Sequence, residues 1–280
     1  MPNSPRLILA LLIGLRLVAV SPAQADDQPF VTLYTTDIDS QGEREFEQSL
    51  GWKGGETSAH YNVLLSRTEL EYGITDNLQG SLYFDAEWDH VRSDLPPFSS
   101  QAESFVGVSG ELIYRLLDED FDPLGLALYV EPTWSGEERE IESKILLQKN
   151  FLNDALRCAL NINIEDDWDR EGSGWERDSA IELDTGVAYA LTSQLSAGLE
   201  FDNERAFEGL AIGTPAREQG SAFFLGPTID YEPLPWKLTL GTQAQLPWAT
   251  SPAGNPGAVI GGFETHAERF RVTLRISRDF

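Results

Sequence analysis

The sequence predicts an all-β fold, a transmembrane antiparallel up-and-down β-barrel of about twelve strands. Three observations lead to this prediction. Apolar and polar residues alternate with period two over segments of about ten residues, as on strands with lipid on one side. Short turns alternate with long polar loops along the chain. After the N-terminal region, no apolar run is long enough for a membrane-spanning helix. A soluble all-β protein is the alternative, because each strand signal is weak alone.

The C-terminal segment shows the alternation most clearly. Because its aromatic end resembles the terminal signal read by barrel-insertion machinery, we assign its apolar face as a membrane-insertion signal: Phe270, Val272, Leu274, Ile276 and Phe280. The opposite face carries Arg269, Arg271 and Arg275. Neighbouring residues on a strand point to opposite faces, so these arginines are expected to face the lumen.

The same pattern upstream defines the remaining strands and their connections. We expect strands near 44–53, 61–73, 78–88, 104–115, 126–134, 140–149, 156–165, 181–191, 195–204, 221–231, 236–246 and 269–280. Short periplasmic turns are expected at 74–77, 116–123, 150–154, 192–194 and 232–235, and long outer loops at 90–103, 166–177, 206–220 and 248–266.

Aromatic residues gather at both ends of the predicted strands, as two interfacial girdles would require. The group at the outer-loop ends is Trp52, Trp88, Trp134, Trp168, Trp175 and Trp248. The group at the turn ends is Tyr72, Tyr114, Tyr189, Tyr231, Trp236 and Phe280.

The N-terminal region divides into a signal peptide and a short pre-barrel segment. Residues 1–25 combine Arg6, an apolar stretch and an Ala23-Gln24-Ala25 cleavage pattern, which predicts a cleaved secretory signal. Residues 26–43 precede the barrel, which is expected to span 44–280. Their apolar residues Phe30, Leu33 and Tyr34 could plug the periplasmic mouth, but we favour a flexible periplasmic leader.

Composition excludes several classes of function. A net charge of −26 makes the chain a poor nucleic-acid binder, because that binding depends on Lys and Arg. Cys158 is the only cysteine, so neither an intramolecular disulfide nor a cysteine-based metal site can form. We expect no cofactor and no resident metal.

Two stretches resemble an uncharacterised family of proteobacterial outer-membrane barrels. The first is Tyr34-Thr35-Thr36-Asp37, followed by Glu45-Phe46-Glu47-Gln48. The second, Glu69-Leu70-Glu71-Tyr72-Gly73-Ile74-Thr75-Asp76, is also similar to a strand–turn–strand motif of barrels described as transporters of the phenol-degradation (MetA-pathway) type. The resemblance covers roughly residues 30–90 and implies location and fold more than activity.

Charged residues on the lumen face are the candidate site. Closure should place the final strand beside the first, so we predict a lumenal Arg–Glu network of Glu45, Glu47, Glu69, Glu71, Arg269, Arg271 and Arg275. An acidic lumen wall with fewer basic partners is predicted from Glu182, Asp184, Glu200, Asp202 and Glu204. The arginine network is favoured as a structural ion-pair ladder over a selective constriction, and the acidic wall as the surface that attracts cations.

Catalytic and metal sites are the rival interpretations. His60, His90 and His266 all fall in or next to outer loops without a convincing Ser or Asn partner for a lipase-type site. Asp166, Asp167 and Asp169 could offer oxygen ligands to Ca²⁺, but the spacing is not that of an EF-hand.

The sequence therefore favours a bacterial outer-membrane channel or transporter for small solutes. The expected partners are outer-membrane lipid, the barrel-assembly machinery and a small solute. The alternatives are a structural barrel with a side-chain-filled lumen and no transport role, and an outer-membrane enzyme that acts on lipids.

Overall fold

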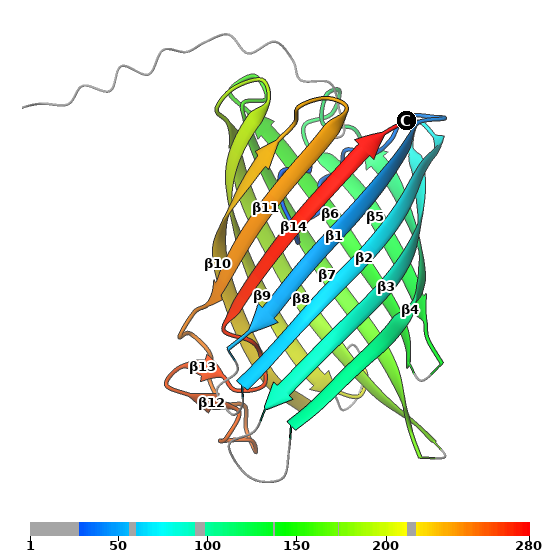
Figure 1. Cartoon of the computed structure of the whole chain (residues 1–280). Helices are drawn as coiled ribbons and strands as arrows, with labels where there is room; N and C mark the ends of the chain where they lie inside the picture. The colour runs from blue at the N-terminus through cyan, green and yellow to red at the C-terminus, as the bar shows by residue number, and fades with distance from the viewer. Residues whose placement is uncertain (1–27, 56–59, 93–98, 137, 173, 212–216) are drawn as a thin grey trace, which may run out of the picture.

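The fold is a closed antiparallel barrel of twelve strands (Figure 1). The computed structural model describes residues 28–55, 60–92, 99–136, 138–172, 174–211 and 217–280. The expected signal peptide, residues 1–25, lies outside the described residues. Each strand pairs with its neighbours in sequence, and β14 closes the barrel by pairing with β1. The predicted fold class is confirmed.

The strands run the length of the barrel at a tilt. In chain order they are β1 (Arg44–Gly54), β2 (His60–Thr75), β3 (Leu78–Arg92), β4 (Ser99–Leu117), β5 (Gly125–Trp134), β6 (Glu138–Phe151), β7 (Leu156–Glu171), β8 (Gly174–Ala190), β9 (Leu195–Glu208), β10 (Arg217–Tyr231), β11 (Trp236–Gln245), β12 (Val259–Ile260), β13 (Phe263–Glu264) and β14 (Phe270–Asp279). The short β12–β13 hairpin lies outside the barrel wall, at the end opposite the C-terminus (Figure 1).

Alternation along each strand separates an apolar outer face from a polar lumen. On β5, Ala127 and Tyr129 are 0% and 3% exposed, whereas Leu128 and Val130 are 46% and 38% exposed. Exposed Leu, Ile, Val and aromatic side chains recur in this way around the barrel. Such an outer surface is typical of a wall that faces lipid.

No helix long and apolar enough to cross a membrane occurs in the described part of the chain.

The connections differ at the two ends of the barrel. Tight turns join β2 to β3, β6 to β7, β8 to β9 and β10 to β11, at the end that carries the C-terminus (Figure 1). At the other end the longest connection, between β11 and β14, contains the β12–β13 hairpin. This asymmetry is that of outer-membrane barrels, with turns on the periplasmic side.

Three of the predicted outer loops are shorter than expected. The flanking strands extend into each of the three ranges: β3 to Arg92 and β4 from Ser99 in 90–103, β7 to Glu171 and β8 from Gly174 in 166–177, and β9 to Glu208 and β10 from Arg217 in 206–220. The prediction was wrong because ladder hydrogen bonds extend a strand whatever its side chains are, whereas apolar alternation marks only the part that meets lipid.

The apolar outer face predicts a position-dependent cost of charge. Leu183 is outward-facing near the middle of β8, where Leu183→Arg should lower the free energy of unfolding in lipid by about 2–4 kcal/mol. Phe121→Arg, in the turn before β5 and 88% exposed, is the matched control and should change it little. Equal effects in a urea titration of vesicle-inserted protein would contradict a lipid-facing wall.

Candidate functional site

The segment before β1 lies inside the barrel and follows its inner wall. We call residues 28–41 the inner collar. Gly42 N donates to Gly73 O on β2 at 2.8 Å. Followed from Gly42 toward the N-terminus, the chain turns into the lumen. It then passes β3, β6, β7 and β9 in turn and reaches β14, where Arg275 Nη2 donates to Gln28 O at 2.9 Å. The collar therefore lies within the turn end of the barrel (Figure 1).

Side chains of the barrel satisfy the backbone of the collar. Asn161 does so in both directions: Tyr34 N donates to its Oδ1 at 2.7 Å, and its Nδ2 donates to Tyr34 O at 2.9 Å. Glu200 accepts from the N–H groups of Val31 and Thr32 at 2.6 and 3.1 Å.

Two glutamines provide further hydrogen bonds to the backbone of the collar. Gln148 Oε1 accepts from Thr36 N at 2.7 Å, and Gln79 Oε1 accepts from Asp39 N at 2.7 Å. Buried backbone N–H groups need partners, and these lumen side chains act for the collar as a neighbouring strand would.

Apolar contacts and glycines in the wall allow the collar to pack closely against it. Phe30 and Leu33 are buried against Ala159 and Ala188, and Ile38 packs with Ile113, Ala127, Tyr129 and Leu146. At Gly241 a Cβ would collide with Val31, and at Gly125 with Thr36. The close approach of the collar therefore requires glycine at both positions.

This placement differs from the flexible leader expected for residues 26–43. Residues 28–43 are held by hydrogen bonds, and Phe30, Leu33 and Ile38 are at most 4% exposed. The short apolar patch finds its partners on the lumen face of strands far away in sequence, which strand alternation does not reveal. β1 begins at Arg44, where the barrel was expected to begin.

Where the collar meets the β4–β5 turn, acidic groups lie close together. The Glu119 carboxylate accepts a hydrogen bond from Asn150 N at 2.8 Å. Burial raises the pKa of Glu119, and repulsion from Asp37 of the collar raises it further. Asp37 in turn lies 3.7 Å from Arg157 Nη2.

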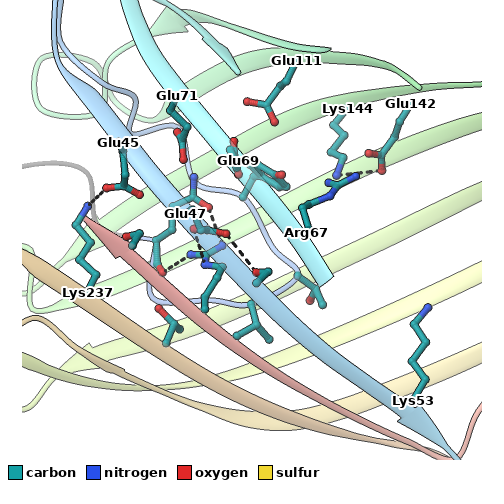
Figure 2. A pocket seen from close by; sticks show the side chains of 18 residues that line it. Glu45, Glu47, Lys53, Arg67, Glu69, Glu71, Glu111, Glu142, Lys144 and Lys237 are labelled. Carbon is teal, nitrogen blue, oxygen red and sulfur yellow. Dashed lines mark hydrogen bonds and ion pairs between the residues drawn. The ribbon is translucent and has the colours of Figure 1, made fainter. Parts of the chain in front are cut away.

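A cavity of about 390 Å³ remains in the lumen beside the collar. Figure 2 shows Lys237 reaching Glu45 at one end of it and Arg67 lying beside the Lys144–Glu142 pair farther along, with Lys53 apart from both. Its lining is Gln28, Val31, Thr32, Tyr34, Glu45, Glu47, Ser49, Lys53, Arg67, Glu69, Glu71, Glu111, Glu142, Lys144, Lys237, Thr239, Arg275 and Ser277.

Some residues of the predicted arginine–glutamate network come together at this cavity. Arg275 Nε lies 3.2 Å from Glu47 Oε2. Glu45 pairs with Lys237 Nζ at 3.1 Å, a partner on β11 that the sequence interpretation missed. Glu71 accepts a hydrogen bond from Gln79, and Glu69 is 6% exposed in the cavity wall.

Arg271 and Arg269 are separated from that group. Antiparallel closure pairs Arg271 with Lys53 and Asp279 with Glu45, so the two arginines lie toward the far end of β14 from Glu45. Arg271 instead binds Glu204 on β9 and Glu268. Arg269 lies over the ring of Phe263 in the β12–β13 hairpin. The prediction that they join Glu45 and Glu47 was wrong because it used adjacency of the strands without their register.

The predicted acidic wall lies on β8 and β9, and Asp184, Glu200 and Asp202 are each less than 5% exposed. In the ladder Glu182 faces Glu204 and Asp184 faces Asp202. Its residues have more partners than expected. Glu200 holds the collar, Glu204 binds Arg271, Asp202 accepts from Gln243, and Asn163 donates to Glu182 and Asp184.

A second cavity, of about 470 Å³, lies on the other side of Arg271. Lys53, Glu204, Glu268 and Arg271 line it, together with residues of β10 and the loop that follows β13. Lys53 lines both cavities. The Arg271 cluster therefore lies between the collar-side cavity and the loop end.

The predicted insertion series lies on the outer face of β14. Phe270 is 53% exposed, and Val272, Leu274 and Ile276 are partly exposed. Phe280 follows the last strand residue, is 68% exposed, and donates its N–H to Arg44 O at 3.0 Å. Its role in insertion stays a prediction.

The alternative catalytic and metal residues do not converge. His266 Nδ1 lies 3.1 Å from Glu264 Oε1 with its side chain 76% exposed, while the side chains of His60 and His90 lie outside the described set. Asp166 forms a bidentate pair with Arg177, whereas Asp167 groups with Glu138 and Glu140. Asp166 and Asp167 are neighbours on one strand, so they point to opposite faces.

The collar's anchors were missed by sequence interpretation. Gln79, Gln148 and Asn161 are uncharged amides at lumen positions of the turn-side half, whereas the predicted site consists of charged residues only. That local change from charge to amide is the signal that could have indicated a bound backbone.

Comparisons with known proteins agree with this architecture. The model of a "Family of unknown function (DUF6662)" matches residues 22–269. No curated protein shows significant similarity to the chain.

Two solved structures share the fold at low sequence identity. The COG4313 outer membrane channel from Pseudomonas putida F1 superposes with a TM-score of 0.61 at 12% identity, covering 90% of this chain and 100% of that one. The NanC porin gives a TM-score of 0.52 at 12% identity, covering 83% of this chain and 98% of that one.

The anchors predict how the collar can be loosened. Gln148→Leu removes the acceptor for Thr36 N and the donor to Asp37. Amide hydrogen exchange of collar residues should then accelerate by about tenfold, as expected for about 1.4 kcal/mol of lost protection. Gln194→Leu, at an exposed position in the β8–β9 turn, is the control. Equal acceleration in both variants, or exchange spread over the barrel strands, would contradict the role of Gln148 as an anchor.

Proposed function

We propose that this chain, which belongs to the DUF6662 family of unknown function, is an outer-membrane channel for small polar solutes whose lumen is narrowed by its own N-terminal segment. The supporting observation is the lumen itself: a closed barrel, apolar outside, whose interior holds a charge-lined cavity of about 390 Å³ next to the collar. A wall of paired charges around open space is the arrangement by which pores select solutes.

Location in a bacterial outer membrane follows from the same architecture. The apolar outer face, the turn and loop asymmetry and the aromatic residues at the strand ends are all features of that class. A signal peptide at residues 1–25, expected from the sequence, is the proposed export route. The named activities of the two structural neighbours, a channel and a porin, support a transport role for this chain.

The lumen favours cations over anions. The Arg and Lys residues that line the cavity beside the collar are outnumbered by Glu residues: Glu45, Glu47, Glu69, Glu71, Glu111 and Glu142 against Lys53, Arg67, Lys144, Lys237 and Arg275. The buried acidic wall on β8 and β9 adds further negative charge. The resemblance of the 69–76 motif to transporter barrels of the phenol-degradation type supports transport in general but not that solute.

A structural barrel without transport is the second candidate, favoured by the filling of the turn-side half. The collar lies against the inner wall there. Ion pairs such as Glu47–Arg275 and Arg67–Glu131 join side chains of different strands within the lumen. A small lumen must pair its charges whether or not it conducts.

Conductance of the purified full chain in planar bilayers tests the channel. We expect resolved current steps and, under a KCl gradient, a reversal potential that shows preference for K⁺, because carboxylates predominate in the cavity wall. Absence of steps above background from protein that migrates as a heat-modifiable barrel would overturn the channel and support the structural barrel.

Removing the collar tests what narrows the lumen. Deletion of residues 28–39 should raise the unit conductance at least about twofold, since this segment lies against the inner wall of the lumen at the turn end. The double substitution Gln148→Leu and Asn161→Leu retains the chain length and should shift the current in the same direction by loosening the collar. Unchanged conductance in both folded variants would contradict the collar as the constriction.

A further inference from the structure

A row of alternating indole and guanidinium groups crosses the outer face of the barrel near its loop end. Trp134 on β5, Arg139 on β6, Trp168 on β7 and Arg177 on β8 are successive register partners. Their side chains share the outward parity of Ile141 and Ile145, which are 44% and 42% exposed. Four adjacent strands thus present one continuous band on the face that meets lipid.

The two arginines of the band differ in their charge partners. Arg177 forms a bidentate pair with Asp166 at 3.0 and 2.7 Å and lies 4.9 Å from the ring of Trp168. The guanidinium of Arg139 lies between two indoles, 5.4 Å from Trp134 and 4.6 Å from Trp175. Across the described residues, no carboxylate lies within ion-pair distance of Arg139.

Arg139 and these rings enclose a groove of about 440 Å³. Trp134, Trp168 and Trp175 form its aromatic sides, while Pro132 and Ile141 extend it toward the middle of the wall. Thr133 and Glu140 also line the groove, but they have the opposite, lumenal parity to Trp134 and Arg139. The outward-facing side chains of the groove thus carry one positive charge at the loop end and are otherwise apolar or aromatic.

The height of the groove is that of a membrane interface. On β7 the outward apolar residues run from Leu156 to Ile164, and Asp166 and Trp168 follow. Eight rises of about 3.3 Å at a tilt of about 40° span about 20 Å, close to the roughly 25 Å apolar band of such barrels. Trp168 and Arg139 therefore lie just beyond the acyl chains.

We propose that this groove binds the phosphate-bearing headgroup of a lipid in the surrounding leaflet, with Arg139 as the partner of the phosphate. Although the chain has a net charge of −26, the described residues place this exposed cation at the lipid level beside indoles and without a carboxylate at ion-pair distance. Phosphate is the anion that a membrane offers at that height, and a guanidinium fixed by stacking on indoles keeps its donors oriented toward it. The acyl chains would lie along Pro132 and Ile141.

The inference rests on the proposed membrane location but not on conductance. It is tested with the full chain in detergent by native mass spectrometry, titrated with phosphatidic acid and, in parallel, with diacylglycerol, which lacks the phosphate. We expect a saturable bound phosphatidic acid and no comparable binding of diacylglycerol. Inorganic phosphate at millimolar concentration should not displace the lipid, because it lacks the apolar contacts; displacement would assign the site to free phosphate and overturn the lipid as occupant.

Substitutions distinguish binding of phosphatidic acid in this groove from nonspecific attraction of the anionic lipid to any exposed arginine. Arg139→Gln should weaken phosphatidic acid binding at least about fivefold, and Arg139→Lys, which keeps the charge without the planar stacking, should be intermediate. Arg205→Gln is the matched control, because Arg205 is an exposed arginine on β9 whose Nε bonds Asn203 at 3.3 Å and not an indole.

The outcomes distinguish this inference from the proposed channel. Equal binding by the wild-type chain and Arg139→Gln, or equal weakening by Arg205→Gln, would overturn the groove whatever the conductance is. Heat-modifiable migration of each variant confirms that the barrel is folded. A chain that binds phosphatidic acid through Arg139 but shows no current steps would retain the lipid site and lose only the channel.

Discussion

Pairing of β1 with β14 is the interaction on which the rest of this structure depends. It joins ten successive residue pairs, from Glu45–Asp279 to Gly54–Phe270, and leaves the barrel without an exposed strand edge. In a lipid environment an unpaired edge would cost several kcal/mol for each unsatisfied group. Closure also assigns every strand residue to lipid or to the lumen. The charges of β1, β2, β9 and β14 are thereby forced into one small interior, where they must find partners across strands.

The lumen resolves that requirement in two ways. Toward the loops, charges pair with charges, as Arg271 does with Glu204 and Glu268. Toward the turns, the ion pairs Lys237–Glu45 and Arg275–Glu47 continue on β1, β11 and β14, while on β3, β6, β7 and β9 neutral amides and one carboxylate bind the backbone of the collar. That backbone has both donors and acceptors and needs no counter-ion. The collar-side cavity lies where the two arrangements meet. Its mixture of Glu, Lys and Arg follows from that boundary, and so does the polar surface that a solute would encounter.

The alternation of apolar and polar residues within each strand predicted the barrel wall. The pairs that form in the lumen depend instead on the register between strands that are distant in sequence. Period two is visible within the seven residues Phe270–Ile276, because lipid acts on each side chain separately. The partner of Arg271 depends on which residue of β9 lies at its level across the lumen, a consequence of tilt and register over the whole barrel. The polar ends of β7 and β8 carry no alternation, so 166–177 resembled a loop. The collar was not predicted because most of its anchors are distant in sequence: Gln148, Asn161 and Glu200 lie more than a hundred positions from the collar residues they bind.

Because the collar follows the inner wall around most of the barrel, its length is related to the circumference of the barrel at that level. Its ends are tied to β2 and β14, and between them it is tied to β3, β6, β7 and β9. An extended chain covers at most about 3.3–3.6 Å per residue, so its reach limits how far those strands can separate. The wall can then neither flatten nor swell at that level without releasing an anchor. The N-terminal segment would therefore limit expansion of the barrel at its turn end, by the length of chain between its anchors.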